Sequence, residues 1–171
     1  AEKIGYPLVM KVVGPVHKSD VGGVVLNVKT KEKLVEEFRR MMQIKDTTAI
    51  LIQPMLSGVE LFAGASREGD FGHLILSGLG GIFVEVLKDV TSGLTPLGKT
   101  EATMMIEGLR GKKILEGVRG QKGVDKEKFA GILTRLSALL QAAPEIAEMD
   151  INPLLGDGSK IVAVDARINI K

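Results

Sequence analysis

A lysine inside an apolar strand, followed by a polar and glycine-rich loop, is the part of this sequence best suited to chemistry. Lys11 interrupts the apolar run 8–13. The loop that follows contains an imidazole, an ammonium, a hydroxyl and two glycines: His17, Lys18, Ser19, Gly22 and Gly23. Cations and open backbone can hold a polyphosphate, and a neutral imidazole can attack its terminal phosphorus. The alternative is a hairpin turn with Lys11 reaching water and His17 solvated.

Two oxygen-bearing side chains near the C-terminus form a second candidate site. Asn152 and Asp165 flank a short turn predicted between antiparallel strands, so both oxygens can face one point. An amide oxygen and a carboxylate suit Mg²⁺, which takes few protein ligands and completes its shell with phosphate and water. Asp150 is a further candidate ligand if its strand alternates regularly. The competing interpretation is an Asx turn at Asn152–Pro153 with Asp165 on the surface.

Two glycine-rich stretches could also contact phosphates. The segment 93–100, GLTPLGKT, matches the Walker A pattern, and IVAVD ending at Asp165 resembles a Walker B strand. We disfavour this P-loop because Pro96 has no N–H to offer and no further βα units follow to build a parallel sheet. The stretch 78–85, GLGGIFVE, ends in a carboxylate and could close over phosphates. A tight turn without a ligand fits that stretch equally well.

The elements that must position these residues follow from hydrophobic periodicity. It predicts strands over 8–13, 24–29, 49–53, 59–65, 71–77, 85–90, 146–151 and 161–166. It predicts helices over 31–44 after a Thr30 N-cap, over 100–109, and from an Asp125 N-cap through 141. This pattern of mixed α and β elements predicts an α+β fold with two unequal lobes and a ligand crevice between them.

The predicted helices carry apolar stripes that should face a core. In the first, the stripe is Leu34, Phe38 and Met41 or Met42, while Glu36 and Arg40 lie at an i,i+4 spacing on the polar face. In the last, the inward residues are Phe129, Ile132, Leu136 and Leu139 or Leu140. His73 lies in the middle of a predicted strand, where we assign it only a structural role.

Composition excludes several classes of function. The 171 residues are 44% hydrophobic and 26% charged, which is typical of a globular chain. A net charge of +2 and the absence of Trp argue against a nucleic-acid partner. Without cysteine there is no thiolate catalysis. No apolar run could cross a bilayer and no signal peptide is visible, so we expect a cytoplasmic protein without membrane contact. The opening residues, without Met, suggest a domain of a longer polypeptide.

Five stretches in order resemble the ATP-grasp domain of the ADP-forming (NDP-forming) acyl-CoA synthetases, relatives of the succinyl-CoA synthetase β subunit. They are GYPLVMKVV, HKSDVGGV, GLGGIFVEVLKDV, LEGVRG and MDINPLL…VAVDAR, between Gly5 and Arg167. The resemblance implies an α+β ATP-grasp fold, with a small subdomain at 1–53, a large one at 54–171 and the nucleotide cleft between them. It also implies that acid, CoA and ATP interconvert with acyl-CoA, ADP and phosphate through an acyl phosphate and phosphohistidines.

The resemblance assigns roles to the loop after the first strand. Lys11 would bind an ATP phosphate, and Lys18 with Ser19 and Gly22–Gly23 would cover it. His17 would be the histidine phosphorylated beside the nucleotide. The connection before His17 departs from the family pattern, since it is shorter and has glycine where many members have serine.

The resemblance assigns the remaining candidates to parts of the nucleotide and to the cation. Along the adenine and ribose it places Gln53, Met55, Leu56 and Glu60. Where the phosphoryl group is exchanged with a partner it places Gly80, Gly81 and Glu85. Asn152 and Asp165 would hold Mg²⁺, the cation that accompanies ATP or ADP. Relatives often carry an arginine where this chain has Gly93–Leu94.

The family's other half is absent from this sequence. It comprises a CoA-binding domain and a ligase domain, or an α subunit, that carries a second phosphohistidine and is expected to recognise the acyl group. We therefore expect the chain to bind Mg-ATP without making acyl-CoA unaided. Three alternatives stay open: a regulatory ATP-grasp module such as those attached to some protein acetyltransferases, a P-loop nucleotide switch, and an assembly module that has lost nucleotide binding.

Overall fold

The chain folds into two compact units, Ala1–Leu56 and Ser57–Lys171. The computed structural model describes residues 1–14, 21–81, 84, 88–117, 120 and 122–170. The units divide after Leu56, whereas the sequence suggested a division after Gln53. The third strand continues to Pro54, and the N–H of Met55 still donates to the carbonyl of Pro7 at 3.0 Å, which keeps this segment with the first unit.

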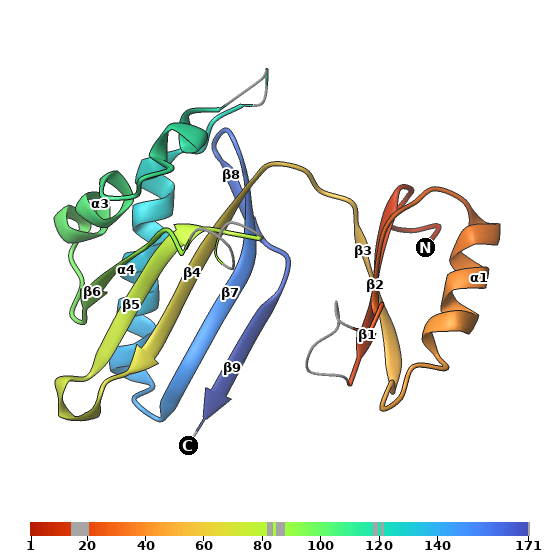
Figure 1. The fold of residues 1–171 in the computed structure, drawn as a ribbon, viewed down its shortest axis with the longest axis horizontal. Helices are drawn as coiled ribbons and strands as arrows, with labels where there is room; N and C mark the ends of the chain where they lie inside the picture. The colour runs from red at the N-terminus through yellow and green to blue at the C-terminus, as the bar shows by residue number, and fades with distance from the viewer. Residues whose placement is uncertain (15–20, 82–83, 85–87, 118–119, 121, 171) are drawn as a thin grey trace. The chain divides into compact units, whose positions relative to one another are not determined.

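In the first unit, the described residues form a three-stranded antiparallel sheet with one helix along it (Figure 1). The order is β2-β1-β3, and the bounds are β1 Leu8–Val13, β2 Val24–Val28, α1 Lys31–Met41 and β3 Ala49–Pro54. Alternation along β1 sends Leu8, Met10 and Val12 into a core that Met41 of α1 completes. Lys11 therefore lies on the opposite face of the sheet from α1.

Helix α1 begins as predicted but ends earlier. The Thr30 hydroxyl accepts a hydrogen bond from the N–H of Lys33 at 3.2 Å, as an N-cap should. The helix stops at Met41 rather than Ile44. The predicted stripe is wrong at Phe38, whose side chain is exposed. Glu36 and Arg40 are both exposed, as expected of the polar face, but they pair with Lys33 and Glu37 rather than with each other.

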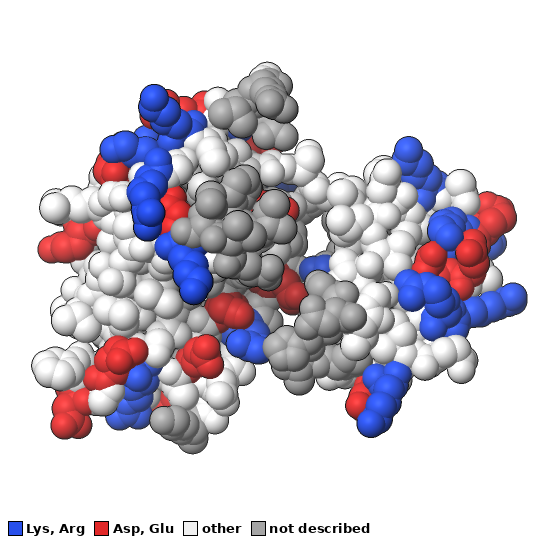
Figure 2. Space-filling view, in the orientation of Figure 1, with Lys and Arg blue, Asp and Glu red and all other residues white. Residues whose placement is uncertain are grey.

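A cluster of charges on α1 makes stability depend on pH. Figure 2 shows positive and negative side chains intermixed over this helix. Hydrogen bonds from Lys33 and Arg40 hold the pKa of the nearly buried Glu37 below its usual range. Because the folded-state pKa is the lower one, the stabilisation is complete above the unfolded glutamate value of about 4.3. It is lost as the pH falls through the lowered folded-state value.

We therefore expect Glu37→Gln to lower the Tm by about 2–3 °C at neutral pH and to have little effect near pH 2. Thermal unfolding followed by circular dichroism from pH 2 to 8 measures this difference. Glu36→Gln is the matched control, since the Glu36 side chain is 69% exposed. An equal loss at both ends of the pH range would show that Glu37 stabilises by packing rather than by charge.

The second unit is built on a larger antiparallel sheet, with six strands in the part of the chain that is described. Its order is β6-β5-β4-β7-β8, and β9 also pairs with β7. The strands are β4 Val59–Arg67, β5 His73–Leu79, β6 Val90–Leu94, β7 Ile146–Asp157, β8 Lys160–Ala163 and β9 Ala166–Ile170. Helices α3 (Lys99–Glu107) and α4 (Lys126–Ala142) lie on one side of the sheet, and short 3₁₀ turns are η1 (Gly69–Phe71) and η2 (Lys112–Glu116) (Figure 1).

The helices α3 and α4 pack on this sheet and build the core of the second unit beneath them. Asp125 caps α4 as predicted, accepting from the N–H of Lys128 at 3.0 Å. Phe129, Leu133 and Leu140 are fully buried against the sheet, whereas Leu139 is exposed. No helix within the described ranges has the length and apolar character needed to span a membrane.

Several predicted strands of the second unit differ from the structure. The strand expected over 161–166 is broken into β8 and β9 at residues 164–165, and the strand expected from Phe71 begins at His73. The strand expected over 85–90 lies partly outside the described residues, and β6 begins only at Val90. The strand expected to stop at Ile151 continues through Asn152–Pro153 to Asp157, so the Asx turn predicted there as an alternative is wrong. Paired strands on both sides hold this segment extended, despite its proline.

Candidate functional site

The first unit offers an apolar sheet face with one ammonium group. Residues directly opposite in an antiparallel pair share a face, and Lys11 lies opposite Leu51 while Val9 lies opposite Gln53. The face away from α1 therefore carries Lys11 and Gln53 together. The Lys11 side chain is largely buried, at 8% exposure. A flat apolar surface with one cation and one amide suits a planar base joined to an anion.

A turn that contains two glycines lies beside Lys11, at the start of β2. We use the name glycine turn for residues 21–23. Gly22 has a φ of 66°, a left-handed conformation that glycine adopts without strain. The carbonyl of Gly23 accepts a hydrogen bond from the N–H of Val12 at 2.8 Å, and Lys11 pairs with Val24. The turn is thereby fixed beside Lys11, as the candidate phosphate site requires.

In the second unit, the candidate residues Glu60, Gly80 and Gly81 lie against one another. The N–H of Gly80 donates to the carbonyl of Glu60 at 2.8 Å. A Cβ at Gly80 would lie 2.6 Å from the backbone oxygen of Leu61, and a Cβ at Gly81, where φ is 60°, would overlap the Glu60 carboxylate. The backbone can approach β4 this closely only because both residues are glycine.

Asn152 connects this glycine pair to the candidate cation ligands. Its Oδ1 accepts a hydrogen bond from the N–H of Gly81 at 3.1 Å. Asp165 lies opposite Asn152, because β7 pairs Leu154 with Ala163 and Ile151 with Ala166 in one continuous register. The two residues thus lie on the two sides of the short turn that joins β7 to β8, and the convergence of their side-chain oxygens on one point stays a prediction.

The side chain of Asp150 faces the same way as Asn152, two residues along β7. Burial raises the pKa of Asp150, and the negative charges of Glu148 and Asp165 act in the same direction, while Arg167 lowers it. Arg167 Nε lies 3.8 Å from Asp150 Oδ1. Carboxylates crowded at one place favour a cation there. The donor set of Asn152 and Asp165, with Asp150 beside it, has the hard oxygen chemistry that Mg²⁺ requires.

Several predicted residues cannot be placed. His17, Lys18, Ser19 and Glu85 lie outside the described residues. Met55 and Leu56, by contrast, are described, and they lie at the end of the first unit, after β3. Within the described ranges, no group of three or more His, Cys, Asp and Glu side chains is arranged to hold a metal. A cation at Asn152 and Asp165 would therefore depend on a phosphate-bearing ligand and water for its other positions.

The Walker A match does not form a P-loop. Two of its backbone donors are already used: the N–H of Thr95 bonds the carbonyl of His73 at 2.9 Å, and the N–H of Leu97 bonds Ser137 Oγ at 2.8 Å. Lys99 pairs with Glu127 at 3.4 Å. The strand before it, β6, is antiparallel to its neighbour β5. The loop therefore lacks the parallel strand and the run of successive N–H donors that characterise a P-loop.

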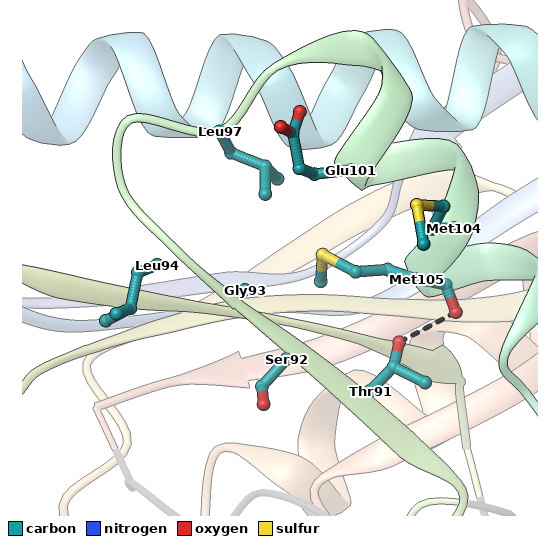
Figure 3. A pocket seen from close by; sticks show the side chains of 8 residues that line it. All are labelled: Thr91, Ser92, Gly93, Leu94, Leu97, Glu101, Met104 and Met105. Carbon is teal, nitrogen blue, oxygen red and sulfur yellow. Dashed lines mark hydrogen bonds between the residues drawn. The ribbon is translucent and has the colours of Figure 1, made fainter.

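A separate hollow of about 380 Å³ lies between β6 and α3 (Figure 3). It is lined by Thr91, Ser92, Gly93, Leu94, Leu97, Glu101, Met104 and Met105. Leu97 and Met105 reach over Gly93, where a Cβ would lie 2.8 Å from Leu97 Cδ1 and 2.9 Å from Met105 Sδ. The lining is mostly apolar and contains none of the predicted site residues. His73 has the structural role expected, with its Nε2 2.6 Å from the carbonyl of Ile146.

Sequence reasoning missed two features of the site. One is a bulge in β7: Asn152 and Pro153 together oppose Phe62 of β4, which changes the face that the later residues of β7 present. The other is Arg40, whose Nη2 donates to the carbonyl of Gly22 at 3.1 Å. The bulge depends on pairing with β4, and the arginine contact joins residues 18 positions apart. Neither leaves a local signal in the sequence.

Comparison with known proteins gives a consistent set of similarities. The family model described as "ATP-grasp domain" matches residues 1–170. The β subunit of acetate–CoA ligase (ADP-forming) I from Pyrococcus furiosus is 43% identical over 97% of this chain and 76% of the relative. Acetate–CoA ligase (ADP-forming) II from Archaeoglobus fulgidus is 44% identical over 98% of this chain, which spans only 25% of that relative.

Solved structures of a dinucleotide-forming acetyl-CoA synthetase from Candidatus Korarchaeum cryptofilum share the fold. The complex with coenzyme A, Ca-AMPCP and HgCl⁺ has a TM-score of 0.91 at 38% identity, over 99% of this chain and 79% of that one. The complex with coenzyme A and Mg-AMPPCP, in which a phosphohistidine segment points towards the nucleotide site, has a TM-score of 0.85 at 38% identity, over 99% and 79% of the two chains.

Proposed function

Because this chain belongs to the ATP-grasp domains of the ADP-forming acetate–CoA ligases, we propose that it binds Mg-ATP and passes the terminal phosphoryl group to a partner that makes acyl-CoA. The complete reaction converts an acid, CoA and ATP into acyl-CoA, ADP and phosphate. The chain spans 25% of a single-chain relative and 76% of a β subunit. The acyl chemistry would therefore belong to the CoA-binding partner.

The observation that carries this proposal is the hydrogen bond between the N–H of Gly81 and Asn152 Oδ1. It joins the glycine pair beside Glu60 to the oxygens of Asn152 and Asp165. A phosphate-binding backbone segment and a cation site are both needed for phosphoryl transfer, and this contact supports the proposal that Gly80–Gly81 and Asn152 would supply them side by side. Mg-AMPPCP in a solved relative supports the same pairing of nucleotide and cation.

Each candidate residue then has a physical task. Lys11 and the glycine turn would hold phosphate oxygens, with Gln53 along the base and Glu60 near the ribose. Asn152 and Asp165 would hold Mg²⁺, which supplies neutralisation of charge on the phosphates. Positioning and charge neutralisation are most of what phosphoryl transfer demands of a protein.

The phosphoryl group itself would be carried by histidine. A neutral imidazole nitrogen of His17 forms an N–P bond as the bond from the γ-phosphorus to its bridging oxygen breaks, and ADP leaves with that oxygen. The partner's phosphohistidine would take part in the onward transfer, at the place where Gly81 and Glu85 are expected. This step rests on the family pattern around His17, which lies outside the described residues.

Calorimetric titration with ATP and ADP, each with and without Mg²⁺, tests the proposal. We expect Mg-dependent binding in the micromolar range, and we expect Asp165→Asn to remove the dependence on Mg²⁺ with at least a tenfold loss of Mg-ATP affinity. Formation of acyl-CoA by the chain alone would contradict the proposal that the acyl chemistry belongs to the CoA-binding partner. Absence of binding, both alone and with the CoA-binding subunit present, would contradict the proposal as a whole.

Labelling with γ-³²P-ATP separates a catalytic domain from a regulatory module. A catalytic domain is expected to acquire acid-labile label that is lost in His17→Asn, since phosphoramidates hydrolyse in acid. Nucleotide binding without any such label, in the presence of the partner subunit, would favour the regulatory alternative.

A further inference from the structure

A buried carboxylate on α1 holds an arginine in one position. Glu37 is only 8% exposed although it is charged. Its Oε2 accepts a hydrogen bond from Arg40 Nε at 2.7 Å, and its Oε1 lies 2.9 Å from Lys33 Nζ. Because both carboxylate oxygens have a cationic partner and the residue is buried, Glu37 can hold the Arg40 guanidinium in place through its Nε–H.

The rest of that guanidinium reaches the glycine turn. Arg40 Nη2 donates to the carbonyl oxygen of Gly22 at 3.1 Å. A Cβ at Gly22 would lie 3.6 Å from Arg40 Nη1, an ordinary van der Waals distance, so the guanidinium also lies close beside this residue. A side chain of α1 therefore holds, through a hydrogen bond, the backbone of the glycine turn that leads into β2.

Because the peptide unit is planar, the contact with Arg40 also determines the direction of the next N–H group. In a trans peptide the C=O and the following N–H point in opposite directions. The carbonyl of Gly22 points to Arg40, which lies on the α1 side of the sheet. The N–H of Gly23 must then point away from Arg40, towards the sheet face that carries Lys11.

We propose that Glu37 and Arg40 are positioning residues for the nucleotide, which turn the Gly22–Gly23 peptide so that its N–H and the Lys11 ammonium address the same phosphate. This inference rests on the proposed function. It goes further by assigning a role to two residues that need not touch the nucleotide. A phosphate oxygen would receive one charged and one backbone donor from adjacent strands, in an arrangement set before the ligand arrives.

Helix α1 contains its own matched controls. Arg39 precedes Arg40, carries the same charge and is likewise exposed, but it lines a shallow depression on the outer surface of α1 with Lys31 and Val35, whereas Arg40 bonds Glu37 and Gly22. Glu36 precedes Glu37 and has a side chain 69% exposed, against 10% for Glu37. Substituting either arginine removes the same positive charge from the same helical turn, and substituting either glutamate removes the same negative charge. Bulk electrostatics and helix propensity are therefore held constant within each comparison.

The test compares the affinity of Arg40→Ala, Arg39→Ala and wild type for Mg-ATP and for AMP, by calorimetry on the full chain. We expect Arg40→Ala to weaken Mg-ATP binding about five- to tenfold and AMP binding less than twofold, while Arg39→Ala changes neither. Arg40→Lys should recover little, because an ammonium cannot span Glu37 and Gly22 as the guanidinium does. Glu37→Gln should act in the same direction as Arg40→Ala, with Glu36→Gln unchanged.

The exchange rate of the Val12 amide adds a readout that needs no nucleotide. Val12 donates to Gly23, so a loosened turn should expose this amide, and we expect faster hydrogen exchange in Arg40→Ala than in Arg39→Ala. Equal Mg-ATP affinities of Arg40→Ala and Arg39→Ala, with wild type binding normally, would overturn the positioning role. A wild type that binds no Mg-ATP, even with its partner subunit, would instead overturn the proposed function and this inference with it.

Discussion

Lys11→Met is expected to weaken Mg-ATP binding by about 100-fold, the largest effect of any single change at the candidate site. Methionine keeps most of the volume and the apolar stem of the buried side chain, so the sheet should remain folded. What is lost is the ammonium on a face that otherwise presents mostly apolar groups beside Gln53. Calorimetric titration measures the loss, and a thermal melt verifies the fold.

Lys99→Met is the control for this experiment and also decides between two phosphate sites. Lys99 belongs to the Walker A match, is 69% exposed and pairs with Glu127. Removing it should leave Mg-ATP affinity unchanged within a factor of two. If Lys99→Met abolished binding while Lys11→Met did not, the nucleotide would have to bind at the segment 93–100, and the proposed function would fail.

Gly81→Ala is expected to reduce Mg-ATP affinity at least tenfold. The new Cβ would overlap the Glu60 carboxylate and sit on a left-handed backbone, at a φ of 60°. Glu60 must move, and the hydrogen bond from Gly81 to Asn152 is disturbed with it. The proposed ribose contact, the glycine pair and the proposed cation ligands would therefore be affected by a single methyl group. The measurement is again titration with Mg-ATP, accompanied by a Mg²⁺ titration at fixed ATP.

Gly69→Ala separates backbone strain from site chemistry. Gly69 also has a left-handed φ, at 53°, but a Cβ there would meet nothing within 4 Å. Both variants should lose about 1 kcal/mol of stability from the strain alone, and only Gly81→Ala should lose nucleotide affinity. Equal affinity losses in the two variants would mean that Gly81 acts on stability and has no special relation to the nucleotide.

Elements whose signal is local could be predicted from the sequence. The caps at Thr30 and Asp125 were confirmed because a side-chain oxygen three residues before an N–H needs no distant partner. The strand 8–13 was confirmed with its bounds, since a continuous β-branched and apolar run bounded by Pro7 and Gly14 has few other options. The ATP-grasp fold was confirmed through the ordered motifs rather than through periodicity.

Features that depend on strand pairing could not be predicted. Residues 90–94, VTSGL, show no alternation, and they form β6 because Leu74 to Gly78 of β5 supply the opposite side of the ladder. Proline normally ends a central strand, yet β7 continues past Pro153 because a bulge opposite Phe62 absorbs the extra residue. The hairpin between Asn152 and Asp165 could be predicted from its turn residues, but the break of the second strand into β8 and β9, both paired with β7, could not.

Side-chain partners on a helix surface were also beyond sequence reasoning. Spacing alone offers Arg40 both Glu36 and Glu37 as neighbours. Arg40 selects Glu37 because that carboxylate is the buried one and because the guanidinium must also reach Gly22. The choice is made by a contact across the fold, which no window of neighbouring residues contains.

The hydrogen bond from Gly81 to Asn152 has a thermodynamic consequence for how the domain would work with its partner. An amide oxygen that serves both a loop and a cation links the two equilibria, and linkage is reciprocal. With Asn152 as the proposed Mg²⁺ ligand, a partner segment that draws Gly81 away from Asn152 would alter Mg²⁺ affinity by the same factor by which Mg²⁺ alters the affinity for that segment. Docking of the partner would then be readable as a shift in the Mg²⁺ titration, before any phosphoryl group has moved.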